Sequence, residues 1–138
     1  MSYDADNVFA RILRGEIPCY RVYEDADTLA FMDIMPQTEG HTLVIPKASA
    51  EDIFSAPAAV LAATIRTTQR IAVAVRKAFD APGVMIAQLN GPAAGQTVFH
   101  LHFHVIPRYA GKDFHMKSGP PADQAVLAAH AARIRAAL

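Results

Sequence analysis

Residues 98–106 read Val-Phe-His-Leu-His-Phe-His-Val-Ile, and this stretch decides the fold that we expect. Histidine alternates with a large apolar residue, which is typical of a β-strand whose two faces differ. One face would pack in the core, and the other would carry His100, His102 and His104. Alternate residues of a strand lie about 6.6 Å apart, so the three imidazoles would line a site that can hold a phosphate chain.

Upstream of this stretch, hydrophobic periodicity predicts a short helix, a hairpin and a further strand. Asp6 can cap the helix, whose apolar side is Phe9, Ile12 and Leu13, and Gly15 ends it. Strands are expected over residues 17–24, 28–32 and 41–46.

A long amphipathic helix is predicted after Pro57, ending before Gly83. The side chains that we expect on its core-facing stripe are Leu61, Ile65, Thr68, Ala72, Val75 and Phe79. A strand over 83–90 and a loop over 91–97 lead into the histidine stretch. A polar segment then runs to Pro121, and Asp123 stands near the start of a last helix marked by Leu127, Ala131, Ile134 and Leu138.

Helices segregated from strands that are joined mostly by short turns predict an α+β fold. We expect a five-stranded, mostly antiparallel sheet with a long central helix and short N-terminal and C-terminal helices. With 138 residues the chain is most simply one domain over 1–138.

Charge and composition exclude several classes of function. The 13 basic and 13 acidic residues balance, and neither sign forms a long run, so we expect no nucleic acid and no membrane partner. No apolar run approaches the roughly 18 residues of a membrane span. The acidic first residues lack an apolar signal core, and the single Cys19 rules out an internal disulfide. A cytoplasmic location is therefore expected.

Three interpretations of the histidines remain open from the residues alone. The first is a zinc site, with His41 as an additional ligand. The second is an ordinary exposed sheet face, which leaves unexplained why every polar position is histidine. The third is nucleophilic catalysis at phosphorus, in which a neutral imidazole forms a covalent phospho-histidine intermediate. The preceding loop favours the third, because Gly95 permits close backbone approach while Gln96 and Thr97 add donors and a hydroxyl.

The stretch from His100 to Ile106 is similar to the signature of the histidine triad superfamily, His-φ-His-φ-His-φ-φ, where φ is apolar. Residues 9–18, 29–37 and 40–47 also resemble the branch of histidine-triad nucleotide-binding proteins. The resemblance covers about residues 6–110 and leaves 111–138 as a C-terminal extension.

The resemblance implies a reaction. His102 would attack the phosphorus next to a nucleoside, and water would hydrolyse the nucleotidyl-histidine intermediate. His104 and His41 would set the tautomer and orientation of His102, His100 would lie at the edge of the site, and Thr97 would support the leaving group. The expected substrates are purine nucleoside phosphoramidates or phosphoanhydrides that release AMP or GMP. The alternatives are hydrolysis of dinucleoside polyphosphates, or a nucleotide-binding regulatory protein with negligible turnover.

The resemblance also implies binding residues. Asp33 would hold the ribose hydroxyls. A mostly apolar base pocket would be formed by Val8, Phe9, Ile12, Phe31, Ile34 and Leu43, which are equally interpretable as core. The residues expected to hold the phosphate and support the leaving group are Asn90, Gly95, Gln96 and Thr97.

Two further implications concern assembly and metal. The resemblance implies a homodimer that pairs through the long helix and the strand after it. Many bacterial relatives place cysteines where this chain has Asn7 and Ala10 and a histidine where it has Ser49. These residues join the first triad histidine in binding a structural zinc. Because His100 alone cannot hold a tetrahedral site, we expect no metal and no cofactor.

Overall fold

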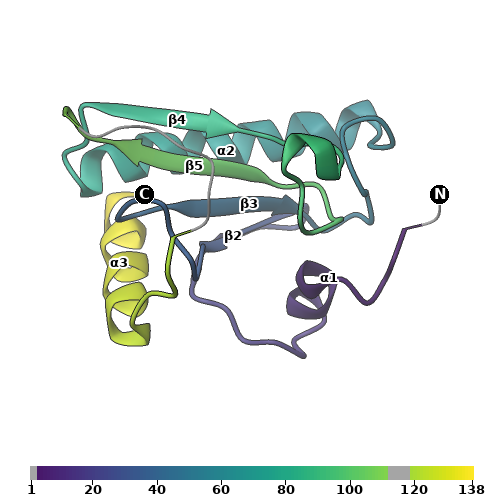
Figure 1. Ribbon diagram of the computed structural model, residues 1–138, viewed down its shortest axis with the longest axis horizontal. Helices are drawn as coiled ribbons and strands as arrows, with labels where there is room; N and C mark the ends of the chain where they lie inside the picture. The colour runs from purple at the N-terminus through teal and green to yellow at the C-terminus, as the bar shows by residue number, and fades with distance from the viewer. Residues whose placement is uncertain (1–2, 112–118) are drawn as a thin grey trace.

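The computed structural model describes residues 3–111 and 119–138, and within them a five-stranded sheet carries the helices (Figure 1). The strands are β1 (Arg21–Glu24), β2 (Thr28–Met32), β3 (Thr42–Pro46), β4 (Gly83–Ala87) and β5 (Phe103–Arg108). The helices are α1 (Val8–Leu13), α2 (Ala58–Ala78) and α3 (Gln124–Ala137), with a 3₁₀ turn, η1 (Pro92–Ala94). The order is β1-β2-β3-β5-β4, with every neighbouring pair antiparallel. The predicted α+β fold is therefore confirmed.

The neighbouring interior strands β2 and β3 are buried on both faces, so their side chains alternate between two hydrophobic clusters. The main core lies under α2 and α3 and contains Val22, Ala30, Met32, Val44, Ile71, Ala74, Val75, Phe79, Val105, Leu127, Ala131 and Ile134. The smaller pocket-side core lies on the opposite face beside α1 and contains Phe9, Leu29, Phe31, Leu43 and Ile45. One cluster thus stabilises the fold, and the other borders the site described below.

The face of α2 that packs on the sheet differs from the predicted stripe. Thr68, Val75 and Phe79 are buried as predicted, but Leu61 and Ala72 are only partly buried and Ile65 is 46% exposed. The buried face instead contains threonines, because their hydroxyls are satisfied locally: Thr64 Oγ1 donates to the Val60 carbonyl and Thr68 Oγ1 to the Thr64 carbonyl. Hydropathy alone therefore misplaces the buried face of the helix by part of a turn.

By length and composition alone, α2 is apolar enough to cross a bilayer. Here, however, Ile71 and Val75 are fully buried in the main core against β3 and β5. Arg66, Arg70 and Arg76 lie on its exposed side. This is the packing of a core helix in a globular domain.

Several predicted element ends shift. The cap of α1 is Asn7 and not Asp6, since Asn7 Oδ1 accepts the Ala10 amide at 2.9 Å. The strand predicted from residue 17 begins only at Arg21, and β4 ends at Ala87. Asp123 lies at the start of α3, as predicted, and it caps the helix by accepting the Ala125 amide at 2.8 Å. Part of the predicted polar segment before α3, residues 112–118, lies outside the described residues.

The histidine stretch is a strand only in its second half. β5 begins at Phe103, where His104 pairs with Leu43 and Val105 enters the main core. The predicted alternation is therefore correct for residues 103–105. The predicted strand is wrong for 98–102, which lie outside the ladder: the Leu101 amide donates instead to the Ala50 carbonyl (2.8 Å), which belongs to the loop after β3.

Candidate active site

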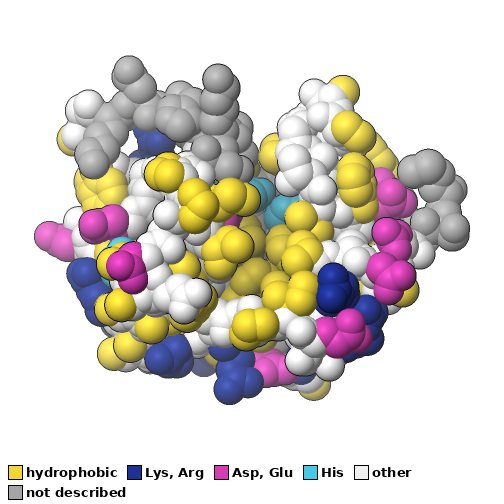
Figure 2. All heavy atoms as spheres, turned by 60° about the horizontal axis from the view of Figure 1, so that its bottom comes forward, with side chains coloured by type: hydrophobic (Ala, Val, Ile, Leu, Met, Phe, Trp, Pro, Cys, Tyr) yellow, Lys and Arg dark blue, Asp and Glu magenta, His cyan; other side chains and the backbone are white. Residues whose placement is uncertain are grey.

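A cavity of about 210 Å³ opens between α1, β2, β3 and the histidine stretch. Figure 2 shows hydrophobic side chains gathered in a hollow on this face, with histidine at its upper end. The predicted residues that line the cavity are Val8, Phe9, Ile12, Phe31, Asp33, Ile34, Leu43, Thr97, His102 and His104. Six of these are apolar residues that the sequence alone leaves equally interpretable as core.

Six lining residues were not predicted: Ile17, Pro18, Cys19, Met32, Met35 and Val98. Ile17, Pro18 and Cys19 lie where a strand was predicted. The backbone there is irregular, because β1 begins only at Arg21, and all three side chains line the cavity. Met35 follows Asp33 in a turn held by the Asp33 carboxylate, which accepts the Met35 amide at 2.8 Å. Aspartate favours such a turn two residues on, so Asp33 is the local sequence signal that could have placed Met35 beside it at the cavity.

The predicted phosphate-side residues Asn90, Gly95 and Gln96 do not line the cavity. Gln96 is 3% exposed, and its amide holds the loop: Oε1 accepts the Gly91 amide at 2.7 Å, and Nε2 donates to the Glu51 and Val98 carbonyls. Asn90 Oδ1 accepts the Ile53 amide at 2.8 Å. Gly95 ends η1 with φ of 100°, a left-handed conformation that favours glycine. This loop leaves Thr97 exposed at the cavity.

His102 lines the cavity, and of its two ring nitrogens only Nδ1 has a hydrogen-bond partner among the described residues. Its Nδ1 lies 2.7 Å from the His100 carbonyl oxygen. A carbonyl only accepts, so Nδ1 carries the proton and Nε2 keeps its lone pair. Phe9 contacts the ring edge-to-face at 4.9 Å between centroids. The ring is thus fixed in one tautomer and one orientation.

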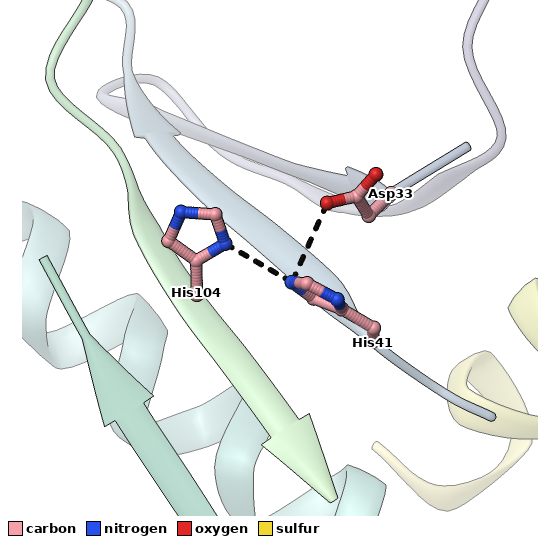
Figure 3. A group of neighbouring side chains, drawn as sticks. All are labelled: Asp33, His41 and His104. Carbon is pink, nitrogen blue, oxygen red and sulfur yellow. Dashed lines mark hydrogen bonds and ion pairs between the residues drawn. The ribbon is translucent and has the colours of Figure 1, made fainter. Parts of the chain in front are cut away.

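His104 and His41 form a hydrogen-bonded pair whose direction is also set by backbone (Figure 3). The Gln37 amide donates to His41 Nδ1 at 3.1 Å, so the proton of the neutral His41 ring is on Nε2. This Nε2–H donates to His104 Nδ1 at 3.0 Å and also faces Asp33 Oδ2 at 3.4 Å. His104 therefore carries its proton on Nε2, away from His41 and available to a ligand.

Burial keeps these imidazoles neutral at physiological pH. Desolvation, followed by neighbouring histidine charge, lowers the pKa of His41 to about 3 and of His104 to about 4. Desolvation likewise lowers the pKa of His102, partly opposed by its hydrogen bond to the His100 carbonyl. Desolvation raises the pKa of Asp33 to about 6. Above pH 6 the site therefore combines neutral imidazoles with one carboxylate.

His100 is fully buried behind the cavity and does not line it. Its Nε2 lies 2.8 Å from the Pro46 carbonyl oxygen, and its Nδ1 lies 2.5 Å from the Tyr3 hydroxyl. Both ring nitrogens therefore have protein partners. Chemically, the arrangement offers a neutral nucleophile at His102, a donor at His104 and an apolar pocket beside them.

Asp33, His41 and His104 are spaced as a metal site would be, with ligand atoms within 4.8 Å of one another. Ligands at zinc bond lengths of about 2.0–2.1 Å in a tetrahedron lie roughly 3.3–3.5 Å apart. His41 Nε2 lies at similar distances from its two neighbours, 3.0 Å from His104 Nδ1 and 3.4 Å from Asp33 Oδ2. Metal-bound histidine, however, normally donates its other ring N–H to an acceptor. Here the other nitrogen of His41 faces the Gln37 amide, which is a donor. The hydrogen bonding therefore does not fit a metal at this cluster.

Comparison with known proteins places the chain in a family. The HIT domain model matches residues 14–111. A crystal structure of a HIT-like protein from Bartonella henselae is 48% identical, covers both chains completely and superposes with a TM-score of 0.94. A hypothetical histidine triad nucleotide-binding protein from Sulfolobus tokodaii is 31% identical, and its structure matches 94% of this chain and 89% of its own with a TM-score of 0.86.

A further relative extends the comparison to a protein named for an enzymatic activity. The adenylylsulfatase HINT3 of Arabidopsis thaliana is 41% identical over 103 residues, which are 75% of this chain and 52% of that protein. The family model, the fold and the sequence identities agree across these comparisons. The chain therefore belongs to the HIT domain family.

Proposed function

We propose that this protein hydrolyses purine nucleoside phosphoramidates or phosphoanhydrides through a nucleotidyl-histidine intermediate on His102. One observation carries the proposal: the bond from His102 Nδ1 to the His100 carbonyl (2.7 Å) leaves Nε2 as an unprotonated nitrogen on a ring that lines the cavity. A nucleophile needs its lone pair free in the ground state. This neutral, oriented imidazole has it.

The reaction proceeds in two steps. The Nε2 lone pair of His102 forms a bond to the phosphorus next to the nucleoside, and the bond from phosphorus to the leaving nitrogen or oxygen breaks. The leaving atom keeps the electron pair and takes a proton from solvent water at the side of the cavity where Thr97 lies. A water molecule then attacks the same phosphorus, the bond from phosphorus to Nε2 breaks, and the proton that the attacking water loses returns to solvent. The nucleoside monophosphate leaves, and His102 is again neutral with its lone pair on Nε2. His104 Nε2–H stabilises charge on the phosphoryl oxygens in both steps.

The cavity supports a nucleoside as the recognised group. Its lining is mostly apolar, as a stacked base requires, and Asp33 stands at its edge as an acceptor for ribose hydroxyls. The names of two relatives, nucleotide-binding and adenylylsulfatase, support a nucleotide that is cleaved. Few base-edge contacts are available from apolar side chains, so AMP and GMP would be bound with little discrimination.

Replacing His102 tests the mechanism. His102→Ala should lose at least about a thousandfold in kcat on adenosine 5′-phosphoramidate, because it removes the nucleophile. It should bind AMP within about threefold of wild type by calorimetry, because the apolar pocket remains. His130→Ala, a histidine of α3 that does not line the cavity, is the matched control. Wild-type activity in His102→Ala would refute the covalent mechanism.

Two comparisons separate the alternatives. The relative rates on adenosine phosphoramidate and on diadenosine polyphosphate distinguish a phosphoramidase from a dinucleoside polyphosphate hydrolase. A regulatory protein would bind AMP yet show no difference in turnover between wild type and His102→Ala.

The proposed reaction uses no metal. In the position of the relatives' structural zinc, Asn7 caps α1, Ala10 has no side-chain donor atom, and both nitrogens of His100 are engaged by Tyr3 and Pro46. These contacts support the absence of a structural site. Stoichiometric zinc in purified, tag-free protein would contradict it, and so would loss of activity after treatment with a chelator.

The proposed assembly is a homodimer through α2 and β4. Ile65 and Val73 on the outer side of α2 are 46% and 53% exposed, and Ile86 of β4 is 42% exposed. Within the described residues β4 is also an edge strand of the sheet, paired only with β5. An apolar helix face next to an open strand edge supports association of two copies.

A further inference from the structure

The acceptor that orients His102 lies in a segment that the sheet does not hold. Pairing of β5 begins at Phe103, so the His100 carbonyl stands outside the ladder. The Leu101 amide, the next group along the backbone, donates to the Ala50 carbonyl at 2.8 Å. This single bond fixes one side of the segment, so the position of the His100 carbonyl must depend on side-chain contacts as well.

The strongest of these contacts are made by the His100 ring itself. Its Nε2 bonds the Pro46 carbonyl, which must accept, so the ring proton is on Nε2. Nδ1 is then an acceptor, and the Tyr3 hydroxyl donates to it at 2.5 Å. The two rings also meet edge-to-face at 5.6 Å between centroids. A fully buried imidazole is in this way satisfied at both nitrogens without a charge.

Tyr3 is held in place by the segment that follows it. Asp4 organises this segment, because its carboxylate accepts the Asp6 amide at 2.9 Å and its carbonyl accepts the Asn7 side-chain amide at 2.7 Å. Arg14, after α1, donates to the Ala5 carbonyl at 2.5 Å. The segment from Tyr3 is thus fastened to α1 on one side and to His100 on the other.

We propose that Tyr3 is a positioning residue for the nucleophile: its hydroxyl holds the His100 ring, and the His100 carbonyl in turn holds Nδ1–H of His102. The inference rests on the proposed role of His102. Tyr3 does not line the cavity, so it acts through His100 and not on the substrate. Without its hydroxyl, the buried Nδ1 of His100 loses its donor, and the ring can move to find another.

Tyr3→Phe tests this with the smallest change. On adenosine 5′-phosphoramidate, kcat should fall about tenfold, because a small displacement of an aligned nucleophile is costly. KM should stay within about twofold, because the cavity wall is unchanged. Tyr23→Phe is the matched control: it also removes a hydrogen-bonded tyrosine hydroxyl, one that donates to Asp25 and accepts from Arg70, each at 3.1 Å, away from the cavity. Thermal unfolding followed by circular dichroism checks that both variants fold.

A double-mutant cycle with His100→Asn tests the route. If Tyr3 acts through His100, adding Tyr3→Phe to His100→Asn should change kcat by less than about twofold. A full further tenfold loss in the double variant would show a different route and overturn the proposal.

Nuclear magnetic resonance of the histidine rings provides a readout that needs no substrate. In wild type, the Nδ1–H of His102 should exchange slowly with water, and His100 should be the Nε2–H tautomer. Tyr3→Phe should speed exchange at His102 Nδ1. An unchanged exchange rate overturns the proposal, as does wild-type kcat in a folded Tyr3→Phe variant. If wild type itself does not hydrolyse the phosphoramidate, the proposed function fails, while these spectra still decide the role of Tyr3.

Discussion

The ring of Phe79 lies directly against Gly40, so that a Cβ at position 40 would come within 2.7 Å of Phe79 Cε2. Gly40 has a left-handed φ of 88° and immediately precedes His41. Phe79 is braced from the other side by Arg133, whose guanidinium lies 4.4 Å from the ring centroid. The end of α2 and the face of α3 thus support the backbone that carries one of the site histidines.

Gly40→Ala should lower the free energy of unfolding by about 2–4 kcal/mol. Alanine is strained at a left-handed φ, and its Cβ would also overlap the Phe79 ring. Gly15→Ala is the control: Gly15 has φ of 78°, but its added Cβ would meet no atom of the described residues within 4 Å. It should cost only about 1 kcal/mol. Urea denaturation measures both, and equal losses would show that contact with Phe79 is unimportant.

Gln37→Pro should lower kcat about tenfold with little change in KM. It removes the amide that donates to His41 Nδ1. The proton of His41 is then no longer restricted to Nε2, and the hydrogen bond from His41 to His104 can reverse. Gln37→Ala removes the side chain but keeps the amide, and it should retain near wild-type kcat. Steady-state kinetics on the same phosphoramidate compares the two, and an equal loss in both would assign the effect to the side chain.

Asp33→Asn should raise stability and weaken nucleotide binding. Burial raises the folded-state pKa of Asp33 from 3.8 to about 6, so above pH 6 the native state carries a poorly solvated carboxylate. Removing this charge should stabilise the protein by up to about 3 kcal/mol at pH 8, and the gain should vanish below about pH 4, where the group is neutral in both states. Urea titrations of both proteins across this range measure it.

The same substitution should weaken AMP binding about 10- to 100-fold, because the charged acceptor for the ribose is lost. Wild-type affinity for adenosine, which has no titrating phosphate, should fall as pH drops through about 6, while Asp33→Asn should be insensitive there. Calorimetric titration with adenosine at several pH values checks this. A pH-independent wild-type affinity would remove Asp33 from the binding site.

Val73→Glu should convert the proposed dimer to a monomer of 14.9 kDa, because it places a charge on the exposed apolar side of α2. Val126→Glu introduces the same charge on α3 at a residue of similar exposure, 44%, and should leave the dimer intact. Sedimentation at micromolar concentration distinguishes them. A wild-type monomer would refute the proposed assembly.

Much of the architecture is predictable because local signals agree with tertiary packing. Strand β2 matches the predicted range, and the alternation of His104 with Phe103 and Val105 correctly separates cavity from core. The family resemblance locates much of the cavity lining as well, from Val8 on α1 to Thr97. Period and motif suffice where a residue lies in a regular element.

The remaining features depend on contacts between distant residues. Tyr3 and His100 are 97 positions apart, and nothing near either signals their hydrogen bond. Periodicity wrongly predicts that the strand includes His100 and His102. A local sequence pattern does not show that the Leu101 amide donates to the Ala50 carbonyl, outside the sheet. Hydropathy predicts that Ile65 packs in the core and that threonines do not. The hydroxyls of Thr64 and Thr68, however, donate to carbonyls of their own helix, so the threonine face can be buried instead.

The pocket-side core has a further meaning for folding. Phe9, Phe31 and Leu43 belong to this cluster and at the same time form the wall of the cavity. On that side, the described part of the chain adds no layer comparable to α2 and α3. A purine seated there would take the place of a missing core side chain, so the nucleotide would act as a structural component as well as a substrate. The melting temperature should then rise with nucleotide concentration, so that thermal unfolding would report nucleotide binding.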